Sequence, residues 1–227
     1  MALSSFVVIR QYRPSDKDPV LNLFSIGIKE HIGPCFYNAM TSPLYLVITM
    51  ALCVAGYLLG SLLGAVVLPG VWAGSVYYSC HEIYSGYVRR RIQTEMQDIP
   101  GNFLSRPDDC FWVAEVEVDG RPQILGMVAV VAQQNGQERF GELFRMIISP
   151  TCRRIGLGLR LTQTVLDHGK ERGFSKVVLE TSCTQRAAVA LYEKAGFNLI
   201  VTHTKSEAAH WMVTLARVTI LKMEKYM

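Results

Sequence analysis

The stretch Cys152-Arg-Arg-Ile-Gly-Leu-Gly-Leu-Arg-Leu161 places two spaced glycines where an apolar segment ends and a helical pattern begins. The segment before it, Gly141 to Ile148, has the composition of a β-strand. The segment from Gly156 to Arg172 repeats its apolar residues with the period of a helix, and Gly173 closes it. The sequence therefore predicts a strand, a glycine turn and a helix in succession.

The turn has the chemistry of a diphosphate site. The first amides of a helix lack partners within the helix and carry the positive end of its dipole. Gly156 and Gly158 remove side chains from this point, while Arg153 and Arg154 add positive charge. A tight turn that needs glycines for geometry alone is the alternative. The dinucleotide pattern G-x-G-x-x-G and the P-loop pattern G-x-x-x-x-G-K-[ST] do not occur here.

The rest of the chain reads as a mixed α/β sheet. Antiparallel hairpins followed by a strand-helix-strand crossover indicate a sheet with both kinds of pairing. A helix is expected from His81 to Gln97. The expected strands are Phe6 to Tyr12, Cys110 to Val118, Pro122 to Ala132, Gly141 to Ile148, Lys176 to Glu180, Phe197 to Thr204 and Trp211 to Leu221, with a second helix from Gln185 to Ala195 and a turn at Asp119-Gly120.

An apolar block interrupts this pattern. No Asp, Glu, Lys, Arg or His occurs from Thr41 to Cys80. A buried core helix needs only about 10 to 14 apolar residues, so the block predicts membrane insertion. It is long enough for two short spans of roughly 17 residues each. We expect the turn near Gly60-Ser61 or Gly64, and a kink or break at Pro69-Gly70.

The composition of the chain limits the kinds of binding partner that we expect. The 227 residues carry a formal charge of +4, and the Lys and Arg residues are scattered rather than gathered in a stripe with aromatic residues. Nucleic acid is therefore not an expected partner. The six cysteines occur singly, without C-x-x-C pairs, and the histidines show no ligand spacing, so no metal site is expected.

Two motifs together resemble a known superfamily. Arg153-Arg-Ile-Gly-Leu-Gly158 resembles the [QR]-x-x-G-x-[GA] signature of the GNAT acetyltransferases, and Ala190-Leu-Tyr-Glu-Lys-Ala-Gly-Phe197 resembles their A-x-x-L-Y-E-K-x-G-F segment. Ile9 to Asp16 looks like the opening strand and turn of that superfamily. The resemblance implies a GNAT fold and acetyl-CoA as co-substrate, with its pyrophosphate at the glycine turn.

A narrower resemblance is to the Camello-like group, which includes cysteine S-conjugate N-acetyltransferase and N-acetylaspartate synthetase. It rests on Lys29-Glu-His31, on Cys110-Phe-Trp-Val-Ala-Glu115 and on the apolar insertion after the first helix. We therefore divide the chain into a first strand and helix (1–40), a membrane-embedded hairpin insertion (41–80) and the remainder of the acetyltransferase domain (81–227). Because strands before and after the insertion belong to one sheet, the number of crossings should be even.

The resemblance also assigns roles. It implies Tyr192 as the general acid near the CoA sulfur and Glu142 as a general base, although each has the alternative of a purely structural residue. Backbone groups of Ile147 and Ile148 would bind the pantetheine arm. Gln185 stands where many relatives carry Asn, which puts that cofactor contact in doubt. The full set of expected cofactor residues is Ile147, Ile148, Arg153, Arg154, Ile155, Gly156, Leu157, Gly158, Leu159 and Gln185.

We therefore predict a membrane-bound N-acetyltransferase of the endoplasmic reticulum that faces the cytosol and acts on a small-molecule amine, a cysteine S-conjugate by preference. The alternatives are a protein-lysine acetyltransferase and a non-catalytic membrane adaptor that keeps the fold. Glu30 and His31 are interpreted as structural rather than as substrate contacts. The run Arg89 to Arg91 is interpreted as a contact for lipid head groups of the bilayer, with an acidic substrate as the alternative.

Overall fold

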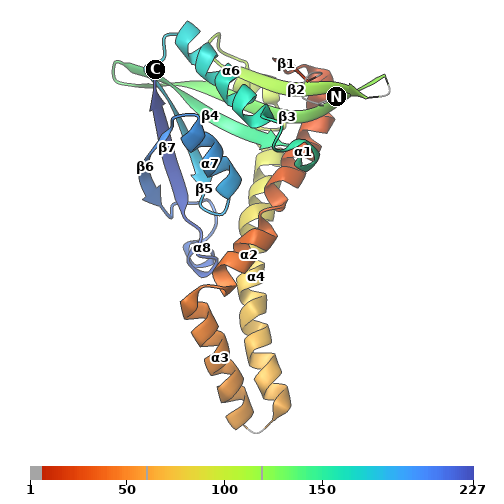
Figure 1. The fold of residues 1–227 in the computed structure, drawn as a ribbon, viewed down its shortest axis with the longest axis vertical. Helices are drawn as coiled ribbons and strands as arrows, with labels where there is room; N and C mark the ends of the chain where they lie inside the picture. Colours follow the sequence, from red (N-terminus) through yellow and green to blue (C-terminus); the bar gives the residue numbers. More distant parts are fainter. Residues whose placement is uncertain (1–6, 60, 119) are drawn as a thin grey trace.

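The computed structural model describes residues 7–59, 61–118 and 120–227, and within these residues it shows one mixed sheet of seven strands (Figure 1). The strand order is β1-β2-β3-β4-β5-β7-β6, and only β4 and β5 run parallel. The predicted α/β class with a mixed sheet is confirmed. The strands are β1 (Val8–Gln11), β2 (Cys110–Val118), β3 (Arg121–Asn135), β4 (Glu138–Ile148), β5 (Lys176–Ser182), β6 (Asn198–His203) and β7 (Ile220–Tyr226).

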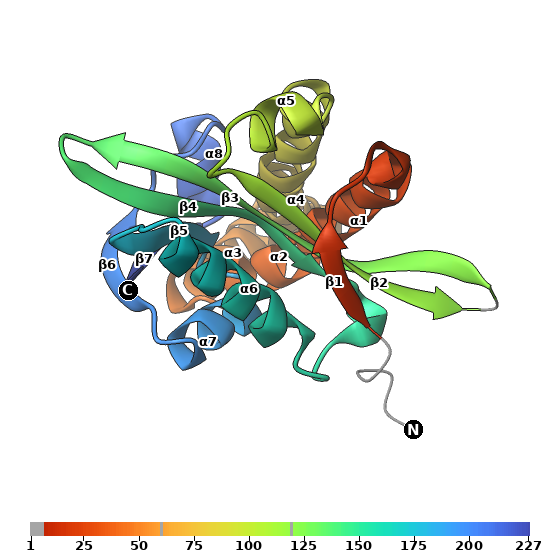
Figure 2. The same cartoon turned by 90° about the horizontal axis from the view of Figure 1, so that it is seen from above.

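Helices cover both faces of the sheet because successive side chains of a strand point to opposite faces. In β2, Phe111 and Val113 pack in one core with residues of α1, α4 and α5, whereas Trp112 packs in the other core with residues of α6 and α7. Figure 2 shows the sheet between these two groups of helices. The helices are α1 (Lys17–Lys29), α4 (Leu62–Gln93), α5 (Ile99–Phe103), α6 (Leu157–Glu171) and α7 (Arg186–Lys194), with 3-10 turns at Pro14–Asp16 and Pro150–Cys152.

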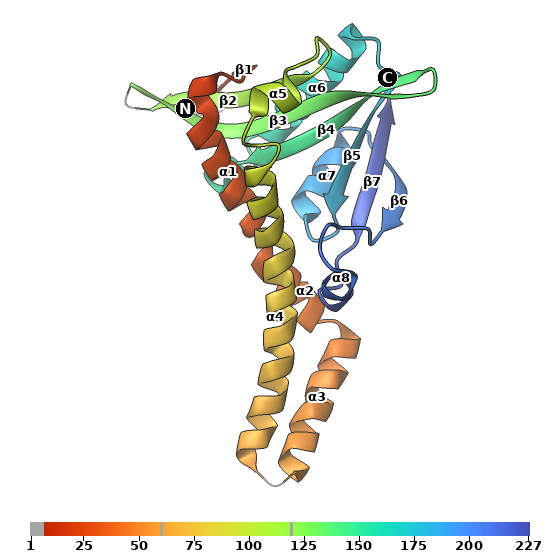
Figure 3. The ribbon, with the colours of Figure 1, turned by 180° about the vertical axis from the view of Figure 1, so that it is seen from behind.

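The parallel pair β4 and β5 separates soon after it forms. Only the residues from Gly141 to Leu143 pair with β5. On the other edge of β4, the register with β3 shifts between Met127 and Ala129, opposite Arg145, whose φ is 55°. Such a bulge bends a strand and increases its local twist. The two strands therefore diverge towards the bottom of Figure 1, and Figure 3 shows the same opening from behind.

The apolar block forms a helical arm below the sheet (Figures 1 and 3). Its helices are α3 (Pro43–Leu58) and the first half of α4, which lie side by side as a hairpin, and α2 (Ile32–Met40) leads into it. A Cβ placed on Gly56 would lie 2.2 Å from the carbonyl oxygen of Gly64, so these glycines let the two backbones touch. The structure thus has a helical hairpin at the predicted place.

The surface of the arm is apolar. Within the described residues, α4 is the one helix that is long and apolar enough by itself to cross a membrane. The segments Pro14–Met40 and Pro43–Leu58 are long and apolar enough only when taken together, and they meet at a bend of 72°. Water-exposed apolar surface of this extent is rare in soluble monomers. The exposed apolar side chains are Leu44, Leu46, Val47, Met50, Val54, Tyr57, Leu58, Leu59, Leu62, Leu63, Val66, Val67 and Val71.

The hairpin turn lies where it was expected, whereas the expected break in the second helix does not occur. The turn lies between Leu58 and Leu62, where the Ser61 hydroxyl accepts a hydrogen bond from the Gly64 amide at 3.0 Å; Gly60 itself lies outside the described residues. The expected break at Pro69 is wrong, because α4 continues through it and also contains most of the helix expected from His81. Packing of α2 and α3 along α4 keeps it helical across the proline.

The predicted strand from Trp211 to Leu221 is also wrong except at its last two residues. Residues His210–Leu215 form a helix, α8, and the strand begins only at Ile220. Val213 and Ala216, three residues apart, are buried against Val76 and Cys80 of α4. This contact with a distant segment favours a helix where the local β-branched and aromatic residues had indicated a strand.

Candidate active site

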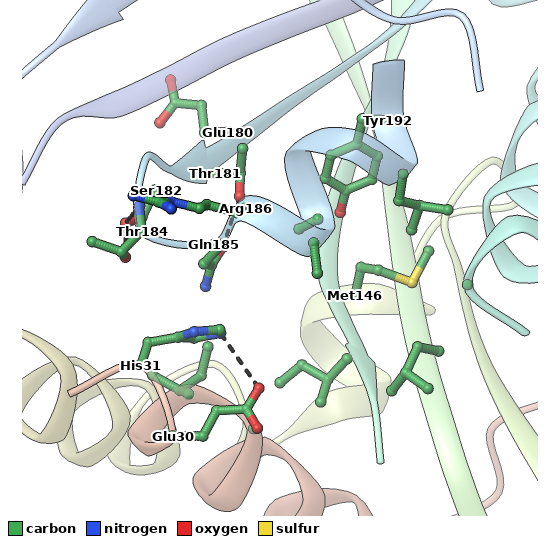
Figure 4. Close-up of a pocket in the computed structure, with 18 of the residues that line it drawn as sticks. Glu30, His31, Met146, Glu180, Thr181, Ser182, Thr184, Gln185, Arg186 and Tyr192 are labelled. Carbon is green, nitrogen blue, oxygen red and sulfur yellow. Dashed lines mark hydrogen bonds and ion pairs between the residues drawn. The ribbon is translucent and has the colours of Figure 1, made fainter. Parts of the chain in front are cut away.

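A cavity of about 1300 Å³ lies in the opening between β4 and β5. Its walls come from α1, α2, α4, β4, β5, α6 and α7, so it passes from one face of the sheet to the other. Figure 4 shows Glu30 and His31 on one wall with Gln185 and Thr184 opposite them. All of the predicted site residues except Ile155 line this cavity. Ile155 instead packs against the core on the α6 side.

The two glycines of the turn have different tasks. Gly156 is the N-cap of α6 with φ 82°, and a Cβ on it would meet nothing within 4 Å. Its left-handed backbone requires glycine, and it leaves open space before the first amides of α6. A Cβ on Gly158 would lie 2.9 Å from Leu191 of α7, so Gly158 serves helix packing. The prediction that both glycines clear space for a ligand therefore holds geometrically only for Gly156.

The rest of the turn supports this placement. Leu157 is 2% exposed and fixes the start of α6 in the core, while Leu159 packs beside it. Arg153 and Arg154 both line the cavity, and Arg154 has a left-handed φ of 62°. Arg153 forms an ion pair with Glu30 at the end of α1. The glycine turn is thereby tied across the cavity to the first helix.

β4 offers backbone groups at the opening. Ile147 and Ile148 pair with β3 on one edge, but their other edge has no paired residue in β5. A buried backbone group without a partner is costly, so a ligand that supplies hydrogen bonds here gains free energy. An extended chain with amide groups can lie along this edge as an added strand would.

Tyr192 and Gln185 face this edge from α7. Tyr192 is 4% exposed, and burial raises the pKa of its hydroxyl, which keeps it protonated and able to donate a proton. Figure 4 shows this hydroxyl on the side towards Met146 of β4. Gln185 accepts a hydrogen bond from the Thr181 hydroxyl at 2.7 Å through its side-chain oxygen, so its amide nitrogen remains to donate.

Glu142 lines the cavity where β4 is still paired with β5. Its carboxylate accepts a hydrogen bond of 3.1 Å from Gln133. Burial and the nearby carboxylate of Glu180 raise the pKa of Glu142, and Lys222 and Gln133 oppose the shift. A carboxylate with a raised pKa is a better proton acceptor from an ammonium group than an exposed one.

Sequence reasoning underrated one wall of the cavity. The structure places Glu30 and His31, which were interpreted as structural, on the cavity wall (Figure 4). The His31 ring lies 3.6 Å from the Glu30 carboxylate, and burial together with Arg153 lowers its pKa despite Glu30. Their position after the first helix was the available signal. Tyr84 also lines the cavity, and its hydroxyl lies 3.0 Å from the Ser182 hydroxyl. The sequence gave no signal for this pair, because the two residues are distant in sequence.

The three side chains of the arginine run form ion pairs with other residues of the chain. Arg89 pairs with Glu82 at 2.6 Å, and Arg90 pairs with Glu207 at 3.3 Å. Arg91 pairs with Glu207 at 2.5 Å and lines the cavity. The interpretation of this run as a lipid contact stays a prediction, and these ion pairs are its contacts within the chain. Among the described residues there is no cluster of His, Cys, Asp or Glu side chains that could hold a metal ion.

Fold and cavity define the class of protein. Residues 77–197 match the model of the Acetyltransferase (GNAT) family, and the chain belongs to this family. A solved acetyltransferase of the GNAT family from Staphylococcus aureus Mu50 shares the fold with a TM-score of 0.56 at 15% identity, covering 97% of this chain and 98% of that one. A GCN5-related N-acetyltransferase from Kribbella flavida gives 0.56 at 14% identity, with 99% of each chain covered.

Its curated relatives are camello and family 8 N-acetyltransferases. The probable N-acetyltransferase camello of Xenopus laevis is 35% identical over 84% of this chain and 85% of its own length. N-acetyltransferase family 8 member 3 of Rattus norvegicus is 34% identical over 83% and 82%, and human N-acetyltransferase 8 is 31% identical over 83% of each. The chain is therefore an N-acetyltransferase, with acetyl-CoA as its co-substrate.

The open space at Gly156 gives a first prediction. Gly156→Ala should weaken acetyl-CoA binding at least tenfold, because the new methyl group occupies the space in front of the α6 amides. Isothermal calorimetry measures this. Gly173→Ala is the matched control: Gly173, at the other end of α6, has the same left-handed backbone (φ 70°) and the same open surroundings. Equal losses of affinity in both variants would show that strain alone is responsible.

Proposed function

We propose that this chain transfers the acetyl group of acetyl-CoA directly to the primary amine of a small amino acid derivative, at the surface of a membrane. The observation that carries the proposal is the single cavity that joins the glycine turn, Tyr192 and Glu142. A cavity that is open to both faces of the sheet lets the acetyl donor and the amine acceptor meet in one ternary complex. No covalent acetyl-enzyme is then required.

In this mechanism the pyrophosphate lies at the α6 amides and the pantetheine arm along Ile147 and Ile148. The amine nitrogen attacks the thioester carbonyl carbon, a C–N bond forms, and the C–S bond breaks. The proton of the amine passes to Glu142, directly or through water. Tyr192 donates its proton to the departing CoA sulfur. Each proton transfer by a positioned group contributes about 10²- to 10⁴-fold to the rate.

The acceptor is proposed to be a cysteine S-conjugate. The apolar arm supports this choice, since a lipophilic thioether partitions into a bilayer next to the site. Aspartate and protein lysines are the competing acceptors, and a non-catalytic adaptor is the competing function.

One experiment separates these possibilities. With acetyl-CoA and purified protein, S-benzylcysteine should be acetylated faster than aspartate or a lysine peptide. Tyr192→Phe should lower kcat at least tenfold and leave acetyl-CoA affinity unchanged, because only the donated proton is lost. Tyr226→Phe, in an exposed position on β7, should leave kcat unchanged. Turnover of the lysine peptide alone would refute the acceptor, and an undiminished kcat in Tyr192→Phe would refute the acid.

The pH profile tests Glu142. A general base acts when it is deprotonated, so kcat/KM should fall as the pH drops through the raised pKa of Glu142. Glu180→Gln removes the neighbouring negative charge and should lower that pKa, which moves the acidic limb of the profile to lower pH. Glu117→Gln, at an exposed position on β2, is the control and should not move it. An acidic limb that persists unchanged in Glu142→Gln assigns the base elsewhere.

Membrane association is proposed from the arm. Residues 41–80 would form a hairpin in the bilayer of the endoplasmic reticulum, and the division into 1–40, 41–80 and 81–227 follows. Both ends of the arm join the sheet at the same side, so the catalytic domain would lie on one side of the bilayer. Basic residues on both flanks favour the cytosolic side.

Protease protection measures this topology. In sealed microsomes, added protease should digest a C-terminal tag without detergent, because the domain lies outside the vesicle. Complete protection of the tag until detergent is added would place the domain in the lumen instead. A lumenal protein of the same microsomes, which the protease should digest only after detergent is added, serves as the control for sealed vesicles.

A further inference from the structure

A cluster of charged residues lines the cavity on the face opposite the glycine turn. Arg91 comes from α4, Arg145 from the bulge of β4, and Glu207 from the segment between β6 and α8; all three line the cavity. Arg90 and Glu95 of the neighbouring turns complete this set, which we call the acceptor-side cluster. Its neighbours Phe24 and Tyr87 belong to the core under α1 and α4. The glycine turn contacts α7 on the other face.

The guanidinium groups are held in place by rigid neighbours. Arg145 donates hydrogen bonds to the Tyr87 hydroxyl and the Glu95 carboxylate. Its guanidinium carbon lies 5.6 Å from the centres of the Phe24 and Tyr87 rings. The guanidinium carbon of Arg91 lies 5.2 Å from the centre of the Tyr87 ring, which Arg91 and Arg145 both contact. Arg91 also pairs with the Glu95 carboxylate at 3.3 Å. A guanidinium fixed in this way loses little conformational entropy when it binds a planar anion.

The cluster carries more positive charge than its own carboxylates neutralise. Three guanidinium groups, of Arg90, Arg91 and Arg145, face the two carboxylates of Glu95 and Glu207. The side-chain Nε atoms of Arg91 and Arg145 are buried and have no hydrogen-bond partner among the described residues. A buried N–H without a partner is unfavourable. The cluster therefore has one more positive than negative charge, which favours an anionic ligand.

Glu207 shows how a carboxylate reaches this place. Its carboxylate contacts Arg91 at 2.5 Å and Arg90 at 3.3 Å, although its side chain is 44% exposed. An exposed ion pair of this kind contributes little to stability, so another carboxylate can replace it at low cost. Glu142, the proposed base, is on the same strand as Arg145 and lines the same cavity. A carboxylate held at Arg91 would therefore leave an adjacent amine on the side of the base.

We propose that Arg91, together with Arg145, forms a subsite for the carboxylate of the acceptor, and that this subsite selects amines that carry a carboxylate next to the amino group. The acceptor carboxylate takes the place of Glu207 at Arg91. This inference rests on the proposed function. It assigns specificity to Arg145, which no sequence motif marked, and to Arg91 of the arginine run.

Two acceptors that differ only in the carboxylate test the subsite. S-Benzylcysteine has it, and S-benzylcysteamine has the same amine and thioether without it. The intact protein should show at least a tenfold lower KM for S-benzylcysteine. Arg91→Gln should remove this difference by raising the KM for S-benzylcysteine, and Arg91→Lys should restore part of it, because the charge remains. Acetyl-CoA affinity, measured by calorimetry, should stay constant.

A control and a second variant keep the test decisive. Arg89→Gln changes the same residue type two positions earlier; that side chain is 59% exposed and pairs with Glu82, so both KM values should be unchanged. Glu207→Gln removes the competing carboxylate at an exposed position, and it should lower the KM for S-benzylcysteine severalfold without affecting S-benzylcysteamine. This variant also serves if Arg91→Gln does not fold.

The outcomes separate the two proposals. If the intact protein acetylates neither amine, the proposed function fails. If it acetylates both with equal KM, the function stands and the carboxylate subsite is overturned. An unchanged KM for S-benzylcysteine in both Arg91→Gln and Glu207→Gln also overturns the subsite.

Discussion

The separation of β4 from β5 is the constraint on which the rest of the structure depends. Two parallel strands normally exchange hydrogen bonds along their whole length, but here the pairing ends at Leu143 and Leu179. The bulge at Arg145 bends β4 away from β5, while the other edge of β4 stays paired with β3. The unpaired edge, the space beside it and the helix starts that border it all follow from this one departure from regular pairing.

The same bulge connects the two substrates. It directs the Ile147 and Ile148 edge towards the glycine turn, the proposed site of the acetyl-CoA pyrophosphate. It also places the Arg145 side chain on the other face, under α1 and α4. A left-handed backbone at a residue other than glycine costs roughly 1–2 kcal/mol. The aromatic rings and the Glu95 ion pair around Arg145 offset that cost.

Helix α4 links the arm to the chemistry. Its 32 residues, about 48 Å at 1.5 Å per residue, begin in the apolar hairpin at Leu62, and its last turns line the cavity with Tyr84, Tyr87 and Arg91. Because the helix is continuous, the position of the arm also sets the position of one cavity wall. The sequence suggested two separate helices here, since proline and glycine at 69–70 weaken a helix in isolation, and packing against α2 and α3 overrides that local preference.

Sequence alone determined the features that depend on short segments: the mixed sheet, the strand-turn-helix at Gly156, Tyr192 on the following helix and the apolar block. These are encoded in local periodicity and in spacing, which a single segment contains. Tertiary structure alone decided which distant residues meet. The Tyr84 hydroxyl reaches Ser182, 98 positions away, and Arg91 reaches Glu207, 116 positions away. His31 became part of the cavity wall and Gly158 a packing residue for the same reason. Such contacts are set by how helices and strands pack around the β4–β5 opening, and no local pattern in the chain records that packing.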